Sequence, residues 1–278
     1  MSGIILSAGV RANLLQLQQT SDLITSTQTK LATGKRVNSA LDNPLNYFTA
    51  QSLDNRASDL SGLLDSMSTA INTIQAANNG ISSITKLVQS AQSLVSQAQQ
   101  TTDTTVRKSL STQFSALLSQ IGSLASDSGF NGINLLGGDN LTVVLNEKSG
   151  SNQSSVTVSG VNYTSTTVAN AALSISNAAG NWASTTNIDA ASSDLTSALT
   201  TLRSESQALG SSLSTVQVRQ DFTKATINTL QAGSDALTLA DSNQEGANLL
   251  ALQTRQQLST TALSLASQAD QNVLRLFG

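Results

Sequence analysis

Residues 60–98, LSGLLDSMSTAINTIQAANNGISSITKLVQSAQSLVSQA, decide the fold because they carry an unbroken seven-residue repeat of apolar side chains. One series, spaced by seven, is made of Leu60, Met67, Ile74, Ile81, Val88 and Val95. A second series follows each of these by three and is made of Leu63, Ala70, Ala77, Ile84, Ala91 and Ala98. This a/d pattern predicts a narrow apolar stripe along one long helix, beginning at about Leu53. Gly62 and Gly80 each weaken it by about 1 kcal/mol relative to alanine.

A second heptad occupies the C-terminal third of the chain. Its members are Ile188, Leu195, Leu202, Leu209, Val216, Thr223, Leu230 and Leu237, of which Thr223 departs from the pattern. A shorter apolar helix is predicted between the two heptads, from Leu110, Phe114, Leu117, Ile121 and Leu124. Two long stripes of this kind predict an antiparallel coiled coil.

The periodicity changes between these helices. Residues 141–146, LTVVLN, and 156–161, VTVSGV, are β-like, and the second segment alternates apolar with polar side chains. Residues 149–188 contain no charged side chain and include the single tryptophan, Trp182. We predict a small β-containing insertion here, with disorder as the alternative.

Both ends of the chain are amphipathic. One stripe is made of Ile5, Ala8, Ala12 and Leu15, and the other of Ala247, Ala251, Leu258, Ala262, Leu265 and Ala269. Neither stripe can bury itself alone, so we predict a chain that leaves and returns along helices and pairs its terminal helices. The neutral residues that flank these stripes favour association with another copy over a closed bundle.

Composition excludes several classes of site. The 278-residue chain has no Cys and no His, so disulfides, thiolate metal sites and histidine bases are excluded. A net charge of −3 without a basic cluster argues against nucleic acid. No apolar run is long enough to cross a bilayer. The first residues lack the cationic start of a cleaved secretory signal.

The segment KLATGKRVNSALDNPLNYF, residues 30–48, resembles a phosphate loop at first sight. That motif requires Gly and Ser or Thr at positions occupied by Thr29 and Arg36, so the match fails. We interpret the segment as a joint in which a terminal helix ends near Gly34 and Pro44 restarts the chain. Asn38, Ser39, Asp42 and Asn43 are expected to bond the local backbone, and Lys35 and Arg36 to reach a neighbouring subunit. Asp241 is expected to cap a helix, not to act as a catalytic acid.

Both ends also resemble bacterial flagellins. The N-terminal match rests on KLATGKRVNSALDN, with Gly34, Arg36, Asn38, Ser39, Ala40 and Asp42 in the motif positions. The C-terminal match rests on residues 236–277 and includes the closing Gln-Asn-Val-Leu-x-Leu at 271–276. The segment Asn43–Phe48 departs from the small residues that the family carries at this point.

The resemblance implies a structural subunit of the flagellar filament, not an enzyme, polymerising through its terminal helices into a helical tube that transmits motor rotation. It implies export without a cleaved signal to an extracellular location. Implied partners are further copies of the chain, the flagellar export machinery and its chaperone, and hook-associated and cap proteins. No cofactor, metal, nucleic acid or membrane insertion is expected.

The expected organisation is a terminal assembly domain (1–40 with 240–278), a coiled-coil domain (41–137 with 190–239) and a small solvent-facing β-containing region (138–189). The candidate interface residues are Ile5, Ala8, Leu15, Lys35, Arg36, Asn38, Asp42, Asn43, Asp241, Leu258, Ala262, Leu265, Val273, Leu274, Leu276 and Phe277. The alternatives are a hook–filament junction protein and a cytoplasmic coiled-coil scaffold.

Overall fold

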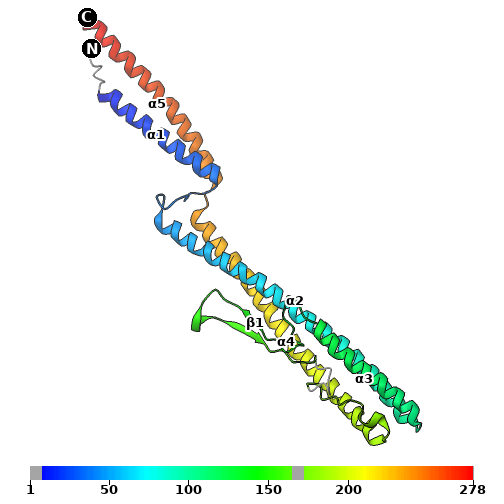
Figure 1. Cartoon of the computed structure of the whole chain (residues 1–278). Coiled ribbons are helices and arrows are strands. Elements are labelled where there is room, and N and C mark those ends of the chain that lie inside the picture. Colours follow the sequence, from blue (N-terminus) through cyan, green and yellow to red (C-terminus); the bar gives the residue numbers. More distant parts are fainter. Residues whose placement is uncertain (1–7, 165–171, 278) are drawn as a thin grey trace. The chain divides into compact units, whose positions relative to one another are not determined.

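The computed structural model describes residues 8–164 and 172–277, which are mostly helical (Figure 1). The helices are α1 (Ala8–Thr33), α2 (Pro44–Gln100), α3 (Thr104–Asp127), α4 (Thr185–Thr238) and α5 (Ser242–Phe277). Strands β1 (Leu141–Val144) and β2 (Ser155–Val158) lie between α3 and α4, with short 3-10 turns η1 (Gly150–Asn152) and η2 (Ala179–Trp182). The predicted fold, mainly helical with a small β insertion, is confirmed.

Contacts divide the chain into two compact units. The first contains residues 1–55 and 229–278, and the second contains residues 56–228. Helices α2 and α4 supply residues to both units. The three-part organisation expected from the sequence stays a prediction.

The core of the second unit is built on the two heptads. All positions of the first heptad from Leu60 to Ala98 are buried except Leu63, which is partly buried against the core. Ser206 Oγ lies 2.9 Å from Asn78 Oδ1, and Gln220 Nε2 lies 2.9 Å from Ser68 Oγ. Because residue numbers rise along α2 as they fall along α4, these contacts make the pair antiparallel. Thr223, the residue out of pattern, is also buried.

Helix α2 turns into α3 through two polar contacts. Asp103 Oδ1 accepts hydrogen bonds from the backbone of Thr105 at 2.7 Å and Val106 at 3.4 Å, which caps α3. Arg107 is buried, and its Nε donates to the carbonyls of Ala98 and Thr101 at the end of α2. A cation at this end of a helix is favoured by the helix dipole, so the dipole and the two carbonyls together stabilise the buried charge.

The start of α2 differs from the prediction. The helix begins at Pro44, not near Leu53. Proline suits the first helical position because its missing N–H has no helical partner there. Asn43 caps the helix, since its Oδ1 accepts from the backbone N–H of Asn46 at 3.0 Å. The heptad does not show this extension because buried contacts continue through the small side chains of Ala50 and Ala57.

The β insertion is a hairpin continued by an irregular segment. Strands β1 and β2 are antiparallel, with Leu141 opposite Val158 and Val143 opposite Val156. Both strands are shorter than the segments predicted. Beyond β2 the chain bonds to an earlier loop, because Tyr163 N donates to the carbonyl of Leu136 at 2.8 Å.

Burial explains part of the missing charge in this region. Four of its large apolar side chains belong to the core of the second unit, namely Tyr163, Leu173, Ile175 and Trp182. The rings of Trp182 and Phe114 lie 5.0 Å apart between centroids. A segment that places its largest side chains in an apolar core cannot carry unpaired charges among them.

Gly80 is expected to be required where α2 meets the loop after α3. A Cβ there would lie 2.3 Å from Ser128 Oγ and 2.7 Å from Leu136 Cδ1. Gly80→Ala should therefore lower the free energy of unfolding by roughly 1–3 kcal/mol, the usual cost of overpacking. Chemical denaturation measures the change.

Gly62→Ala is the matched control on the same helix, because a Cβ at Gly62 meets nothing within 4 Å. This change should raise the free energy of unfolding by about 0.5–1 kcal/mol through helix propensity alone. Equal stabilisation by both substitutions would show that the loop does not pack against Gly80.

Tyr163 should give the second unit an alkaline instability. Burial, with a smaller contribution from Glu205, raises the pKa of Tyr163 from 10.0 to about 12. Below pH 10 both folded and unfolded chains keep the phenolic proton. Between pH 10 and 12 the unfolded chain loses it first, so the free energy of unfolding falls, by roughly 1–2 kcal/mol. Denaturation at several pH values should show a shallower alkaline loss in Tyr163→Phe, and identical slopes would contradict this.

Candidate assembly surfaces of the terminal helices and the joint

Helices α1 and α5 pack side by side in the first unit (Figure 1). The α1 residues buried in this pair are Val10, Thr20, Ile24 and Thr27. The partly buried positions of α5 recur every three or four residues, at Leu249, Leu252, Gln256, Ser259, Leu263 and Ala266. Lys30 Nζ and Glu245 Oε1 lie 3.9 Å apart at one end of the pair. The predicted pairing of terminal helices is confirmed.

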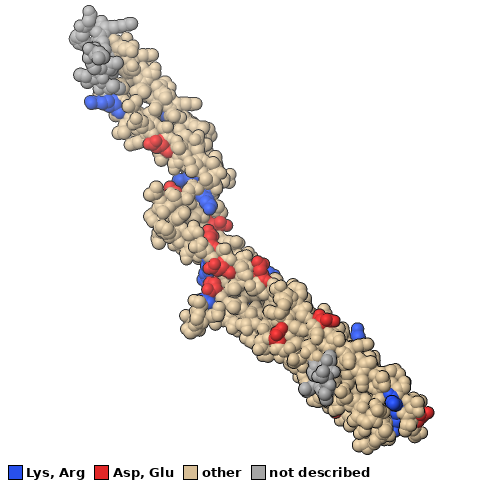
Figure 2. Space-filling model, viewed as in Figure 1, with Lys and Arg blue, Asp and Glu red and all other residues tan. Residues whose placement is uncertain are grey.

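A second apolar face remains exposed on each of these helices. On α1 it contains Leu14, Leu15 and Leu23, and on α5 it contains Leu250, Leu258 and Leu265. These six leucines are between 42% and 67% exposed. Figure 2 shows few charged side chains over these helices, whereas charges gather around the hairpin turn. The pair therefore offers an apolar surface with little charge.

The predicted C-terminal stripe lies on this exposed face. Ala247, Ala251, Leu258, Ala262 and Leu265 are all exposed, so the contact with α1 uses a different side of α5. Ala8 and Leu15 are exposed on α1 in the same way. Ile5 lies outside the described residues, as do the side chains of Val273, Leu274, Leu276 and Phe277. Their roles at an interface stay predictions. Sequence reasoning missed Leu250, because two apolar periodicities overlap along α5.

The joint after α1 is held by backbone pairing with the end of α4. Gly34 adopts a φ of +69°, which glycine tolerates and which ends α1 after Thr33. The carbonyl of Gly34 accepts from the N–H of Ala240 at 2.9 Å, and the carbonyl of Thr238 accepts from Arg36 N at 2.8 Å. The segments 34–36 and 238–240 therefore run antiparallel. No spacing in the sequence signals this pairing of segments about 200 residues apart.

Asp42 organises the remainder of the joint. Its Oδ2 accepts hydrogen bonds from the backbone N–H groups of Asn38 and Ser39, both at 2.9 Å, and from Ser39 Oγ at 3.2 Å. The bonds from Asn38 and then Ser39 lower the pKa of Asp42 below 3.8. Asn38 also donates through Nδ2 to the carbonyl of Lys35 at 3.0 Å. The predicted local bonding across the turn is confirmed.

Two of the polar candidates, Arg36 and Asp241, form hydrogen bonds with the backbone at helix ends of their own chain. Arg36 Nη2 donates to the carbonyl of Ala236 in the last turn of α4 at 3.0 Å, so this side chain has a partner inside its own subunit. Lys35 is exposed and forms no ion pair with a described residue. Asp241 caps α5 as predicted, since Oδ1 accepts from Asn243 N at 2.9 Å and Gln244 N at 3.2 Å.

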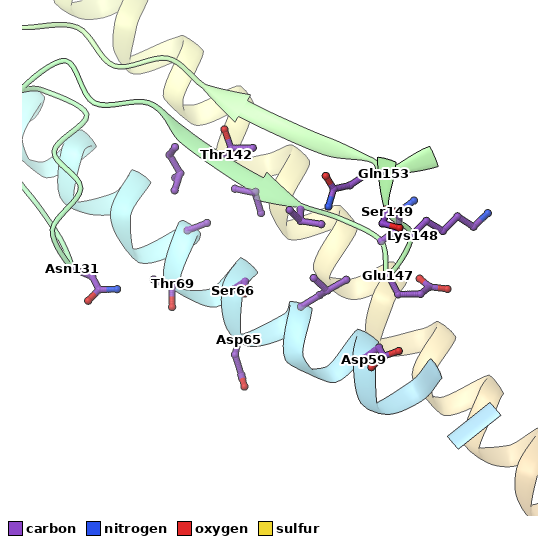
Figure 3. Close-up of a pocket in the computed structure, with 16 residues that line it drawn as sticks. Asp59, Asp65, Ser66, Thr69, Asn131, Thr142, Glu147, Lys148, Ser149 and Gln153 are labelled. Carbon is purple, nitrogen blue, oxygen red and sulfur yellow. The ribbon is translucent and has the colours of Figure 1, made fainter. Parts of the chain in front are cut away.

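A groove of about 810 Å³ in the second unit separates the hairpin from α2. Figure 3 shows Glu147 and Lys148 on the turn of the hairpin, near Asp59 of α2. Glu147 pairs with Arg56, and a backbone hydrogen bond together with that arginine lowers the pKa of Glu147. With no His or Cys in the chain, the groove cannot hold a histidine base or a thiolate nucleophile.

Residues 8–164 and 172–277 contain neither a candidate metal site nor a candidate membrane span. Within these ranges no three His, Cys, Asp or Glu side chains lie close enough together to hold a metal ion. No helix in these ranges combines the length and the apolar character needed to cross a membrane.

Comparison with known proteins gives the family. The model of the bacterial flagellin N-terminal helical region matches residues 8–141, and that of the C-terminal helical region matches residues 192–277. Flagellin A of Rhizobium meliloti (strain 1021) is 41% identical over 91 residues, which cover 33% of this chain and 23% of that relative. The segments matched in this and similar relatives thus span about a quarter of their length or less.

A further relative matches over the whole chain. Flagellin FljK of Caulobacter vibrioides (strain ATCC 19089 / CIP 103742 / CB 15) is 29% identical over 283 residues, covering 100% of this chain and 99% of the relative. The two family models cover most of the chain between them, including α1, α2, α3 and α5. The chain therefore belongs to the bacterial flagellin family.

Proposed function

We propose that this chain is a structural, non-enzymatic subunit of the bacterial flagellar filament and polymerises through its terminal helices into a tube that transmits motor rotation. Membership of the flagellin family supports the role in the filament. The observation that carries the mode of assembly is the exposed leucine face of α1 and α5. A face of this kind is typical of a surface that another protein covers.

Assembly would draw its free energy from burying these leucines. Each leucine that is fully buried contributes about 1.5–3 kcal/mol. Contacts between different surfaces of successive subunits do not have to close into a ring, and they then generate a helical filament. The terminal helices pair within the subunit, but their outer leucine faces would find partners only in neighbouring subunits, so the pair would become fully ordered as the filament grows.

The partners of this role follow from the family. Further copies of the chain form the filament, the flagellar export machinery and its chaperone deliver the subunit, and hook-associated and cap proteins meet the ends of the polymer. The filament subunit would lie outside the cell, exported without a cleaved signal. Growth of long filaments from seeded pure protein distinguishes this role from that of a hook–filament junction protein, which would cap or join without growing.

Leu258→Ser should impair assembly without unfolding the second unit. The side chain is 67% exposed in the subunit and would be buried in the filament. Losing about 1.5–3 kcal/mol per contact raises the critical concentration for polymerisation roughly 10- to 150-fold. Sedimentation of filaments against free subunits measures it.

Gln257→Ser on the neighbouring exposed position of α5 is the control and should change the critical concentration little. Denaturation of the unassembled Leu258→Ser subunit should match that of the unchanged chain. A critical concentration that Leu258→Ser leaves unaltered would argue that the exposed leucines stay in solvent in the polymer.

Asp42→Ala should change filament shape or assembly while leaving the helix content of the subunit nearly intact. The carboxylate holds two backbone N–H groups of the joint and no part of a helix interior. Because its pKa is lowered, these bonds are present above about pH 3.8 and are lost as pH falls through the folded value. Electron microscopy and circular dichroism measure the two effects.

Asp54→Ala is the control, since Asp54 is exposed and forms no ion pair with a described residue. It should leave filament shape unchanged. A large loss of helix content in Asp42→Ala would instead assign the joint to folding of the subunit.

A further inference from the structure

The start of α2 carries an unusually exposed apolar cluster. Leu41 is 95% exposed, Leu45 is 76% exposed and Phe48 is 62% exposed, and we call these three residues the entry patch. Between residues 43 and 53 there is no charged side chain. Large contiguous apolar side chains left in water mark a site of interaction with another protein.

The entry patch borders a shallow groove of about 490 Å³. The lining residues form two rows along the helix, Pro44 with Phe48 and Ser52, and Leu45 with Thr49 and Leu53. Members of each row are four residues apart. Rows with this spacing are the ridges by which helices most commonly interlock.

A groove with the same row spacing lies on the exposed face of α5. Its volume is about 540 Å³, and we call it the α5 groove. One row consists of Leu250, Thr254 and Leu258. The other row consists of two alanines, Ala247 and Ala251, followed by Arg255. The two alanines leave room beside the leucines for a large side chain from another helix.

We propose that the entry patch of one subunit docks into the α5 groove of a second copy of this chain. Phe48 and Leu45 lie over Ala247 and Ala251, and the i, i+4 rows of the two helices interlock. The inference rests on the proposed filament function and names two of the surfaces that meet.

Charge selects α5 over α1 as the occupant. Asp42 adjoins the entry patch, and its Oδ1 accepts no hydrogen bond from a described residue. Arg255 is the only charged residue between 246 and 269, and it forms no ion pair with the described part of the chain. On α1 the exposed face of Leu15 carries Asp22 seven residues later as well as Arg11 four residues earlier, so a carboxylate there would meet a repelling charge beside an attracting one, whereas the α5 groove offers an arginine alone.

The geometry also favours continued growth. The entry patch and the α5 groove are different surfaces of the same subunit, so each copy offers one of each to its neighbours. Contacts of this heterologous kind extend into open helical polymers unless their rotation closes a ring.

Disulfide mapping tests the contact. Because the chain has no native cysteine, only the introduced thiols can form a disulfide. Two populations, one carrying Phe48→Cys and the other Leu250→Cys, are assembled together from seeds and oxidised. The mixed filaments should yield roughly tenfold more disulfide-linked dimer than a control mixture of Phe48→Cys with Gln253→Cys, because bridging requires Cα atoms within about 7 Å. Gln253 is exposed on α5 but does not line the groove.

Each population assembled alone should give no linked dimer. Linked dimer from Phe48→Cys alone would overturn the inference in favour of a symmetric contact. Filaments that form normally without the mixed dimer would overturn it too, while leaving the proposed filament function standing. Failure of the unchanged chain to grow filaments at all would instead remove the proposed function on which the inference rests.

Discussion

A helix with apolar side chains on two sides can bury only one of them against a single partner, and this constraint governs the first unit. Helix α5 places Leu249, Leu252 and Leu263 toward α1, and it leaves Leu250, Leu258 and Leu265 in solvent. The second unit has no such surplus along its heptads, because α2, α3, α4 and the insertion surround one continuous core. The heptads of the second unit therefore close on one core, whereas the first unit keeps an apolar face in solvent, which the proposed assembly would cover.

Low charge follows from the same constraint. Unpaired charges within an apolar surface oppose the burial of that surface by a partner. The residues from 246 to 269 accordingly contain Arg255 as their single charge. Neutral Ser, Thr and Gln supply the polar surface of these helices without that penalty. Many of the helical hydroxyls bond the carbonyl four residues earlier, as Thr25, Thr29 and Thr33 do along α1.

The sequence predicted what depends on local periodicity. The burial of Met67, Ile74 and Leu202 follows from a seven-residue repeat, and the hairpin follows from alternation near Val156. Features that depend on distant segments could not be predicted. From the sequence alone, Gly80 only weakens a helix, and its need to be glycine depends on the close packing of Ser128 and Leu136. In the same way, no residue near Arg36 indicates that its guanidinium donates to a carbonyl at the end of α4.

The candidate assembly surfaces could also be predicted only in part from the sequence. The exposed positions of Leu15, Leu258 and Leu265 could be proposed from spacing, because an amphipathic stripe identifies an apolar face even when its partner is unknown. Which face meets α1 could not, because α5 carries two overlapping repeats and only the packed pair distinguishes them.

The joint between α1 and α2 is held together by hydrogen bonds. Its hydrogen bonds are of two kinds: local ones centred on Asp42, and long-range ones that tie Gly34 and Arg36 to the end of α4. Both kinds use backbone groups that the interruption between α1 and α2 leaves without helical partners, so the joint satisfies itself within one chain. Its polar atoms are consequently poor candidates for the main attraction between subunits. In the proposed assembly that attraction would come from the apolar side chains beside it, Leu41, Leu45 and Phe48, which the described part of the chain leaves exposed.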